Sequence, residues 1–238
     1  MRKARARAIV LAAFAATAAV TALAIFEPAV AAIGCPACYG FETVERNTFI
    51  DRSASPRQRD RARTVAHEAR RKVSAFYGRQ ESSPSLFICT TAGCYARIGG
   101  GASHGQAILD IGLFLSSQGF TPVIAAHELS HVELHKRLGR LKTLERRIPQ
   151  WFDEGVAVIV SGDPRYPLAQ DDRQCAGAMQ GEMPTSRSAW VQDPGHDRLY
   201  ARAARRIGCW MSHRGGPGAV VALIAKVAAG IPFADAYR

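Results

Sequence analysis

His127 and His131 are the residues of this chain best suited to chemistry, because they lie four positions apart with Glu128 directly after the first. On an α-helix this spacing places both imidazoles on one face, where they can share a metal ion. Glu128 can then reach a metal-bound water without being a ligand itself. Zinc lowers the pKa of such a water from about 15.7 to about 7, and the carboxylate can take up and return its proton. The pattern therefore predicts hydrolysis at a zinc ion.

A third protein ligand is required at a catalytic zinc site, and the sequence offers two candidates. His135 continues the spacing of four, but it lies about 12 Å along the helix from His127, too far for both to bind one ion. We therefore interpret His135 as a solvated histidine or as one that supports a ligand. Glu154, on a segment that begins at Pro149, can complete a His-His-Glu set from a second helix. The alternative for Glu154 is an exposed carboxylate on an ordinary amphipathic helix.

The two histidines need a helix to position them, and the local sequence predicts one of about four to five turns. Thr121 is an N-cap residue type and is followed by a proline, which suits the first helical position. Gly139 follows a basic last turn and is suited to end the helix. In the segment of Glu154, the small residues Gly155 and Ala157 would allow a close approach to the histidine helix.

Two motifs give the chain a resemblance to the gluzincin clan of zinc metallopeptidases. The first is His-Glu-x-x-His at residues 127–131, and the second, about two dozen residues later, is Trp-Phe-x-Glu-Gly-x-Ala at residues 151–157. The chain is most similar to the small peptidase-MA-like branch related to the catalytic domains of the M1 aminopeptidases, over roughly residues 105–238. It lacks the Gly-x-Met-Glu-Asn motif by which M1 aminopeptidases hold a free amino terminus, so exopeptidase specificity is not implied.

The resemblance implies that His127, His131 and Glu154 bind one zinc ion per chain and that Glu128 is the general base and acid. In such enzymes a tyrosine or histidine on the C-terminal helices often hydrogen-bonds the oxyanion. Tyr200 is the first candidate for that role, and its alternative is a half-buried helix residue without one. Two histidines follow it as candidates: His196 and His213.

The sequence also predicts roles for one residue and two segments near the motifs. Asp153 can orient a ligand histidine with its carboxylate, or it can be an acidic residue in the first turn of its helix. By resemblance, residues 106–113 form the strand that lines the cleft and pairs with extended substrate. The stretch 162–197 is long and contains scattered Pro, Gly and Asp residues, which predicts a loop able to cover the cleft.

The fold class predicted for residues 32–238 is α+β, in one domain. A helix is expected from Ser55 to about Tyr77, and strands are expected at residues 85–89 and 106–113. The expected architecture is a small N-terminal β-sheet packed on the zinc-binding helix, followed by a mostly helical C-terminal half.

Residues 1–31 are predicted to be a targeting segment, either a cleaved signal peptide or a retained N-terminal membrane anchor. A basic start precedes an uncharged apolar run over residues 9–26, and residues 29–31 fit a small-x-small cleavage site. A third interpretation takes residues 32–35 as a degenerate lipobox with Cys35 as the lipid attachment point. Each of these three interpretations implies that the domain is exported. The predicted location is therefore extracytoplasmic: periplasmic, secreted or held at the membrane.

Six cysteines agree with export, because disulfides persist in oxidising compartments. Proximity in the sequence favours pairing of neighbours, with the last two cysteines fixing the long loop. The resulting pairs are Cys35–Cys38, Cys89–Cys94 and Cys175–Cys209. The first pair also has the Cys-x-x-Cys spacing of disulfide oxidoreductases. A structural disulfide is the alternative, because this motif directly follows the targeting segment rather than a buried strand.

The net formal charge of +11 limits the kinds of molecule that the protein is expected to bind. The arginines of the helix expected at 55–77 are interpreted as solvated surface. They are not accompanied by the aromatic side chains that nucleic-acid binding needs, so no nucleic acid is expected. Association with anionic membrane or cell-envelope polymers fits the charge. The partner expected at the site itself is a peptide or protein substrate.

The sequence as a whole predicts an exported zinc metallopeptidase that hydrolyses peptide bonds through a metal-bound water activated by Glu128. Two alternatives belong to other classes: an inactive zinc-binding scaffold of the same fold, and a disulfide oxidoreductase that works through Cys35 and Cys38. The intact Glu128 argues against the scaffold, because a non-catalytic site has no need of that carboxylate. Manganese or another divalent metal could replace zinc, since His and Glu ligands do not select strongly.

Overall fold

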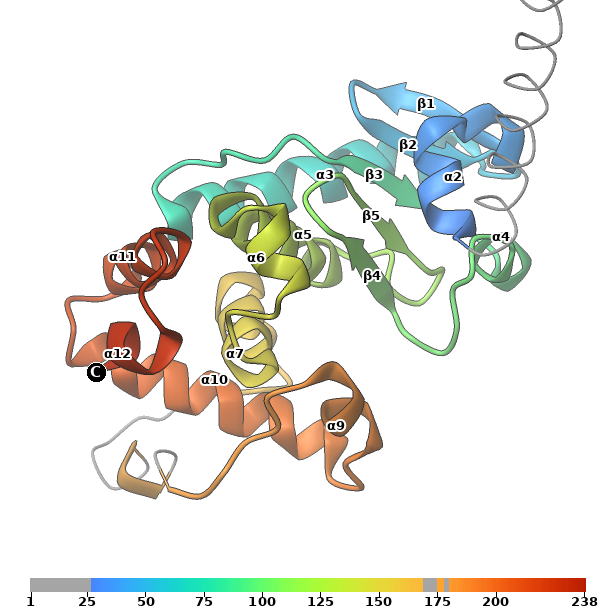
Figure 1. The fold of residues 1–238 in the computed structure, drawn as a ribbon. Coiled ribbons are helices and arrows are strands. Elements are labelled where there is room, and N and C mark those ends of the chain that lie inside the picture. Colours follow the sequence, from blue (N-terminus) through green and yellow to red (C-terminus); the bar gives the residue numbers. More distant parts are fainter. Residues whose placement is uncertain (1–26, 169–174, 178–179) are drawn as a thin grey trace, which may run out of the picture.

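The computed structural model describes residues 27–168, 175–177 and 180–238 (Figure 1). The predicted α+β class is confirmed, because a small mixed sheet occupies the N-terminal half and helices follow it. The sheet lies beside α5 (Pro122–Leu138), and α7 (Gln150–Ser161) and then α10 (His196–Ser212) follow on the other side of that helix. The histidine helix is therefore central, with the sheet on one side and the C-terminal helices on the other.

The strands of the sheet run in the order β1-β2-β3-β5-β4. They are β1 (Phe41–Glu45), β2 (Thr48–Asp51), β3 (Ser85–Ile88), β4 (Gly105–Ile108) and β5 (Gly112–Leu115). The pairs β2–β3 and β3–β5 are parallel, whereas β1–β2 and β4–β5 are antiparallel hairpins. β4 is thus an edge strand, and no described strand pairs with its outer side.

The segment 106–113, predicted as one strand, is instead the hairpin of β4 and β5, so that prediction was wrong in its detail. The chain reverses at residues 109–111, where the Ile111 amide donates to the Ile108 carbonyl (3.1 Å). Leu109 has a φ of 46°, in the left-handed region that leucine rarely adopts. The segment lacks the Asn-Gly or Gly-rich pair typical of a tight hairpin, so its apolar residues indicated one continuous strand.

Helices cover both faces of the sheet. On one face, α3 (Pro56–Tyr77) and α5 pack into the main hydrophobic core. On the other face, a second core gathers beneath α2 (Pro28–Gly34) and α4 (Ala92–Arg97), where Phe87 stacks on Phe114 with ring centroids 4.5 Å apart. The sheet therefore lies between two sets of helices, and α5 packs against its last two strands, β4 and β5.

The predicted helix from Ser55 is confirmed as α3. Ser55 accepts a hydrogen bond from the Gln58 amide, and the Gln58 side chain accepts one from the Ser55 amide, which together form a capping box. The remaining helices are α6 (Arg140–Leu144), α9 (Arg187–Gln192), α11 (Pro217–Ala228) and α12 (Phe233–Tyr237).

The targeting segment falls mostly outside the described residues, which begin at residue 27. The predicted cleavage site at residues 29–31 lies inside α2, where Ala29 and Ala32 are buried in the second core. Cleavage after residue 31 would divide this helix and remove Ala29 from the core. Within the part of the chain that the structure describes, no helix is both long and apolar enough to cross a bilayer.

All three predicted disulfides are confirmed: Cys35–Cys38, Cys89–Cys94 and Cys175–Cys209. They support the predicted extracytoplasmic location, because such bonds persist in oxidising compartments. A disulfide-bonded Cys35 has no thiol to carry a lipid, which argues against the lipobox interpretation. Cys35, the first cysteine of the motif, precedes only the four-residue 3-10 turn η1 (Pro36–Tyr39) rather than a long helix, and a helix N-terminus is one feature that activates redox cysteines. The structural interpretation of this pair is therefore favoured.

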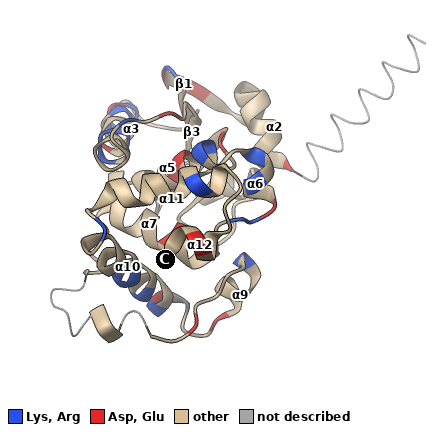
Figure 2. Ribbon diagram, turned by 60° about the vertical axis from the view of Figure 1, so that its left-hand side comes forward, with Lys and Arg blue, Asp and Glu red and all other residues tan. Residues whose placement is uncertain are grey.

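Lys and Arg residues recur along α3 and α10 (Figure 2). On α3, Arg59 forms an ion pair with Glu42 and Arg70 forms one with Glu45, both at 2.7 Å. These contacts are those of a solvated basic surface that is partly neutralised by nearby acids, as the sequence predicts.

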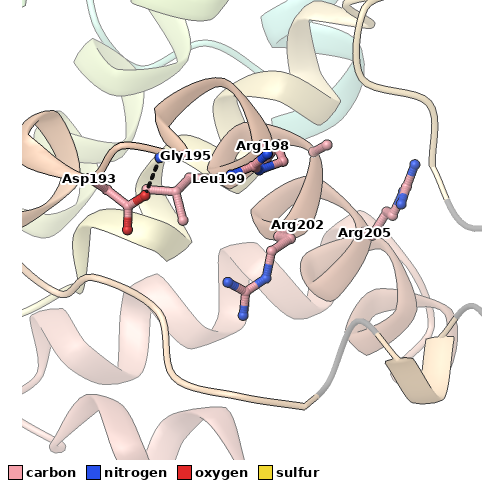
Figure 3. A pocket seen from close by; sticks show the side chains of 7 residues that line it. Asp193, Gly195, Arg198, Leu199, Arg202 and Arg205 are labelled. Atoms are coloured by element: carbon pink, nitrogen blue, oxygen red, sulfur yellow. Dashed lines mark hydrogen bonds between the residues drawn. The ribbon is translucent and has the colours of Figure 1, made fainter.

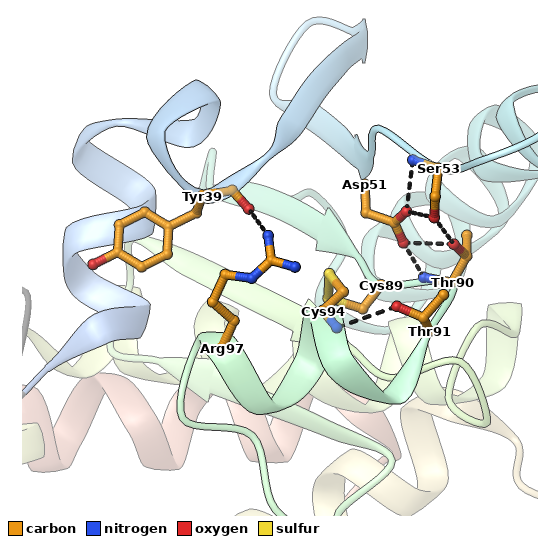
Figure 4. The surroundings of a disulfide bond; sticks show 8 residues. All are labelled: Tyr39, Asp51, Ser53, Cys89, Thr90, Thr91, Cys94 and Arg97. Atoms are coloured by element: carbon orange, nitrogen blue, oxygen red, sulfur yellow. Dashed lines mark hydrogen bonds between the residues drawn. A yellow bond between two sulfur atoms is a disulfide. The ribbon is translucent and has the colours of Figure 1, made fainter.

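A buried carboxylate, that of Asp51, joins the end of β2 to the segment of the Cys89–Cys94 disulfide (Figure 4). Asp51 accepts hydrogen bonds from the amides and hydroxyls of both Ser53 and Thr90. Burial by itself raises the pKa of Asp51, but these four hydrogen bonds outweigh it, and the pKa is lowered. The network therefore stabilises the ionised carboxylate in the folded state.

Asp51→Asn is expected to lower the free energy of unfolding by about 1.5–3 kcal/mol at neutral pH, the range for hydrogen bonds to a charged group. Because the folded-state pKa is lowered, this stabilisation is present above the unfolded pKa of about 3.9 and is lost as the pH falls through the folded value. Chemical denaturation at pH 7 and at about pH 2 measures the difference, with the exposed Asp60→Asn as the control. An equal loss at both pH values would contradict this account.

Candidate metal centre

α5 carries the histidine pair and is fixed at both ends. Thr121 caps it by accepting a hydrogen bond from an amide of the first turn (3.2 Å), as predicted. Near the other end, Glu133 is fully buried and accepts hydrogen bonds from the amides of Glu81 (2.9 Å) and Ser82 (2.8 Å) and from Nε of Arg137 (2.7 Å). These contacts leave the histidine face of the helix available for other partners.

The three atoms expected to bind metal lie together. Nε2 of His127 and Nε2 of His131 are 3.2 Å apart, and Oε2 of Glu154 is 3.2 Å from the first and 3.5 Å from the second. A tetrahedral ion with ligand distances of about 2.1 Å holds its ligand atoms about 3.4 Å apart. The spacing is therefore that of one face of a zinc coordination tetrahedron, and this group could hold a metal ion.

Asp153 fixes the ring of His131, which is one of the two roles expected for it. Its Oδ1 lies 2.7 Å from Nδ1 of His131. An ionised carboxylate can only accept a hydrogen bond, so Nδ1 donates to Asp153 and Nε2 faces the metal position, where it would give up its own proton when a cation binds. Since Asp153 directly precedes Glu154, one helix supplies both a candidate ligand and the hydrogen-bond support of another candidate ligand, His131.

The electrostatics of the group favour an anionic Glu154. Burial raises the pKa values of Asp153 and Glu154, but the neighbouring histidines outweigh it, and both pKa values are lowered. For His131 the opposite holds: burial lowers its pKa, and the two carboxylates outweigh burial and raise the pKa well above its usual range. Glu154 is therefore ionised at neutral pH, the state in which a carboxylate binds a cation.

Glu128 lies beside this group without belonging to it. Its side chain is buried, and burial raises its pKa despite the opposing effect of His127 and His131. Strand β4 passes close by, since a Cβ atom on Gly105 would lie 2.6 Å from Cγ and 2.8 Å from Oε1 of Glu128. Only glycine leaves Glu128 this space. Sequence reasoning missed Gly105, because one glycine before an apolar segment is a weak signal.

The helix of Glu154 is placed by contacts that the sequence indicated only in part. Gly155 was expected to bring α7 close to α5, but it faces α10 instead: a Cβ atom there would lie 2.7 Å from the carbonyl oxygen of Ala203. Because Gly155 has no side chain, α10 can pack closely against α7, and α10 carries Tyr200. Gln150, also missed, donates from Nε2 to Oε1 of Glu154 (2.8 Å), which leaves Oε2 for the metal position.

Tyr200 lies at the site, with its ring centroid 6.1 Å from that of His127. Burial and the charge of Glu154 raise its pKa, so the hydroxyl keeps its proton and can donate. His213 is not brought to the site: its Nδ1 donates to the Cys209 carbonyl (2.8 Å), at the other end of α10 from Tyr200. The side chain of His196 lies outside the described part of the chain.

The start of the long segment 162–197 also lines the site. Arg165 holds the buried Asp163 with two guanidinium nitrogens, at 3.0 Å and 2.6 Å. The same guanidinium lies 5.2 Å from the ring centroid of Tyr166, and that ring stacks on Tyr200 at 5.4 Å. No motif marks these residues in the sequence. Residues 169–174 and 178–179 of the segment predicted to cover the cleft lie outside the described residues.

A cavity of about 440 Å³ lies along α10, on the helix that also carries Tyr200 (Figure 3). Three arginines are among its lining residues: Arg198, Arg202 and Arg205. Arg202 donates to the Glu182 carbonyl (3.2 Å) and Arg205 to the Pro167 carbonyl (3.3 Å), so both hold the long segment against the helix. None of the metal-binding group lines this cavity.

Comparisons with protein-family models, with characterised proteins and with solved structures give no match. The gluzincin resemblance therefore depends on the two sequence motifs alone. The distances from Glu154 to the two histidines are separate support for a metal centre, because they follow from packing of α7 against α5 and not from the His-Glu-x-x-His motif.

Proposed function

We propose that the protein is an exported, zinc-dependent peptidase of the gluzincin type. The observation that carries this proposal is the mutual spacing, 3.2–3.5 Å, of the ligand atoms of His127, His131 and Glu154. Two imidazoles and one carboxylate form a donor set that suits zinc and that recurs in catalytic rather than purely structural sites. A zinc ion held there would lower the pKa of a bound water and polarise a substrate carbonyl.

Glu128 provides proton transfer in this proposal. It follows the ligand His127 directly, is buried, and has a pKa raised by that burial, which brings it closer to the working pH of a general base. Tyr200 is the proposed oxyanion donor, since it lies beside His127 and its hydroxyl stays protonated and can stabilise developing negative charge on a carbonyl oxygen. These roles are those of a hydrolase rather than of an inert zinc scaffold.

The edge strand β4 supports a peptide as the substrate. Its outer side is unpaired among the described strands, and its first residue, Gly105, lies against Glu128. An extended peptide added to this edge by backbone hydrogen bonds would pass in front of the carboxylate. Main-chain pairing of this kind tolerates many side chains, so the proposal includes unfolded proteins as substrates.

The test is hydrolysis of an unfolded protein mixture by the zinc-loaded protein, with cleavage sites identified by mass spectrometry. Cuts are expected that disappear when a chelator removes the metal and return when zinc is restored. Their sequences would give the first specificity profile. One zinc bound per chain with no cuts from any unfolded substrate would favour the scaffold alternative instead.

Gly105→Ala is expected to lower kcat by roughly 10²-fold, because the new methyl group must displace the base Glu128 by a fraction of an ångström or more. Zinc content should be unchanged, since none of the ligand atoms is touched. Steady-state kinetics and metal analysis measure both. Gly101→Ala is the matched control, because a Cβ atom there meets nothing within 4 Å. Equal kinetics for the two variants would remove Gly105 from the site.

A further inference from the structure

His135 lies outside the metal-binding group, yet it connects two elements that surround the group. Its Nδ1 lies 3.2 Å from the carbonyl oxygen of Leu109, and its Nε2 lies 3.4 Å from Oδ2 of Asp153. Leu109 is the first residue after β4, and Asp153 is on α7. One imidazole on α5 therefore contacts the edge strand's turn on one side and the third-ligand helix on the other.

The direction of each hydrogen bond follows from the partners. A carbonyl oxygen can only accept, so Nδ1 of His135 donates to Leu109. The ionised Asp153 carboxylate can only accept as well, so the contact at Nε2 is attractive when Nε2 also carries a hydrogen and the ring is the imidazolium. The two oxygens of Asp153 are then divided between two histidines: Oδ1 accepts from His131 at 2.7 Å, and Oδ2 faces His135. The terminal torsion of an aspartate is soft, so a contact at Oδ2 restricts rotation of the carboxylate. Restricting Asp153 restricts the ring of His131, whose Nε2 is a ligand atom.

The left-handed conformation of Leu109 belongs to the same connection. A leucine with φ of 46° is strained, and such residues persist where the surrounding structure fixes them. Here the conformation lies at the reversal between β4 and β5, and the Leu109 carbonyl is the group that His135 contacts. At its other end the same strand touches Glu128 through Gly105. The start of strand β4 thus contacts Glu128, the proposed base. The turn after the strand contacts His135, which in turn contacts Asp153.

We propose that His135 is a positioning residue that couples the end of strand β4 to the metal ligand His131 through Asp153. The proposal rests on the proposed metal centre, but it concerns contacts that exist within the protein chain. Its ring lies 6.3 Å from that of His131, so it acts through Asp153 rather than as a ligand. A peptide that pairs with β4 would therefore act on the same network that orients the ligand.

The test compares three substitutions that preserve different parts of this connection. His135→Leu removes both contacts, His135→Gln places an amide donor near the position of Nε2, and His135→Asn places one near the position of Nδ1. With His135→Leu, one zinc per chain should still bind at saturation, but zinc should dissociate roughly 10-fold faster, as expected when the support of a ligand is weakened. His135→Gln should restore most of the wild-type rate, and His135→Asn should not. The exposed Lys136→Gln on the same helix is the control.

Two further measurements separate this inference from the proposed activity. In the metal-free protein, the Nδ1 proton of His131 should exchange with solvent more slowly in the wild type than in His135→Leu, as measured by NMR. Because this readout needs neither zinc nor substrate, it stands even where peptide hydrolysis fails. The effects of His135→Leu and Asp153→Asn on zinc dissociation should also be less than additive, since both act on one connection. An unchanged dissociation rate in His135→Leu, or full additivity, would overturn the proposal.

Discussion

Glu154→Gln is expected to weaken zinc binding by at least about 10²-fold, because even the outer supports of a metal ligand contribute 10–100-fold in affinity. The substitution keeps the size of the side chain and removes its charge, which the site holds ionised. In the wild type, Nε2 of Gln150 donates to Oε1 of Glu154 at 2.8 Å. In the variant the same donor faces an amide instead of a carboxylate. The loss should be measured by competition with a chelator of known affinity.

The same variant should lose most of the stabilisation that zinc gives to the folded protein. At free zinc about 1,000 times the dissociation constant, a bound ion stabilises the folded state by about 4.1 kcal/mol, and a 100-fold weaker site removes about 2.7 kcal/mol of this. Thermal unfolding with and without zinc measures the difference, and Glu68→Gln, a partly exposed glutamate on α3, is the control. An unchanged zinc-dependent shift would mean that Glu154 is not the third ligand.

The local sequence predicted the helices of the site well, because their end signals are short-range. Ser55 and Thr121 cap their helices through their own side chains, and the spacing of His127 and His131 needs only helical geometry. Glu154 could be selected because the histidine pair requires a third ligand. For the caps and the histidine pair the information lies within a few residues of the feature that it determines, whereas Glu154 was selected from a motif more than 20 residues upstream.

The features that sequence reasoning missed depend on contacts between distant segments. Gly105 is needed because Glu128 lies against it from another element, and Gly155 faces α10 rather than α5. The strands β1 and β2 were not predicted, and the β4–β5 reversal at Leu109 was mistaken for a continuous strand. His135 was excluded as a ligand by its distance along the helix, and it is not part of the group that could hold a metal. Its contact with Leu109 could be seen only once the hairpin was placed.

Glu128→Gln is expected to reduce kcat for peptide hydrolysis by about 10²- to 10⁴-fold, the usual contribution of a positioned general acid–base group. The amide has nearly the same shape, so it fills the space beside Gly105 and leaves the ligand atoms in place. It cannot accept a proton, and the raised pKa that burial gives to Glu128 has no counterpart in the amide. Zinc content and thermal stability should therefore stay close to those of the wild type while the rate falls.

This combination of results distinguishes the proposed peptidase from its alternatives. A Glu128→Gln variant that loses both metal and activity would indicate that the carboxylate supports the site rather than the reaction. A variant that keeps full activity would exclude Glu128 as the base, and the hydrolysis would then have to be attributed to another group or to a contaminant. Thiol–disulfide exchange activity that survives Glu128→Gln but is lost in Cys35→Ser would favour the disulfide oxidoreductase. Only a large fall in kcat with zinc retained places the proton transfer on Glu128, because only that group changes its chemistry while the ligands do not.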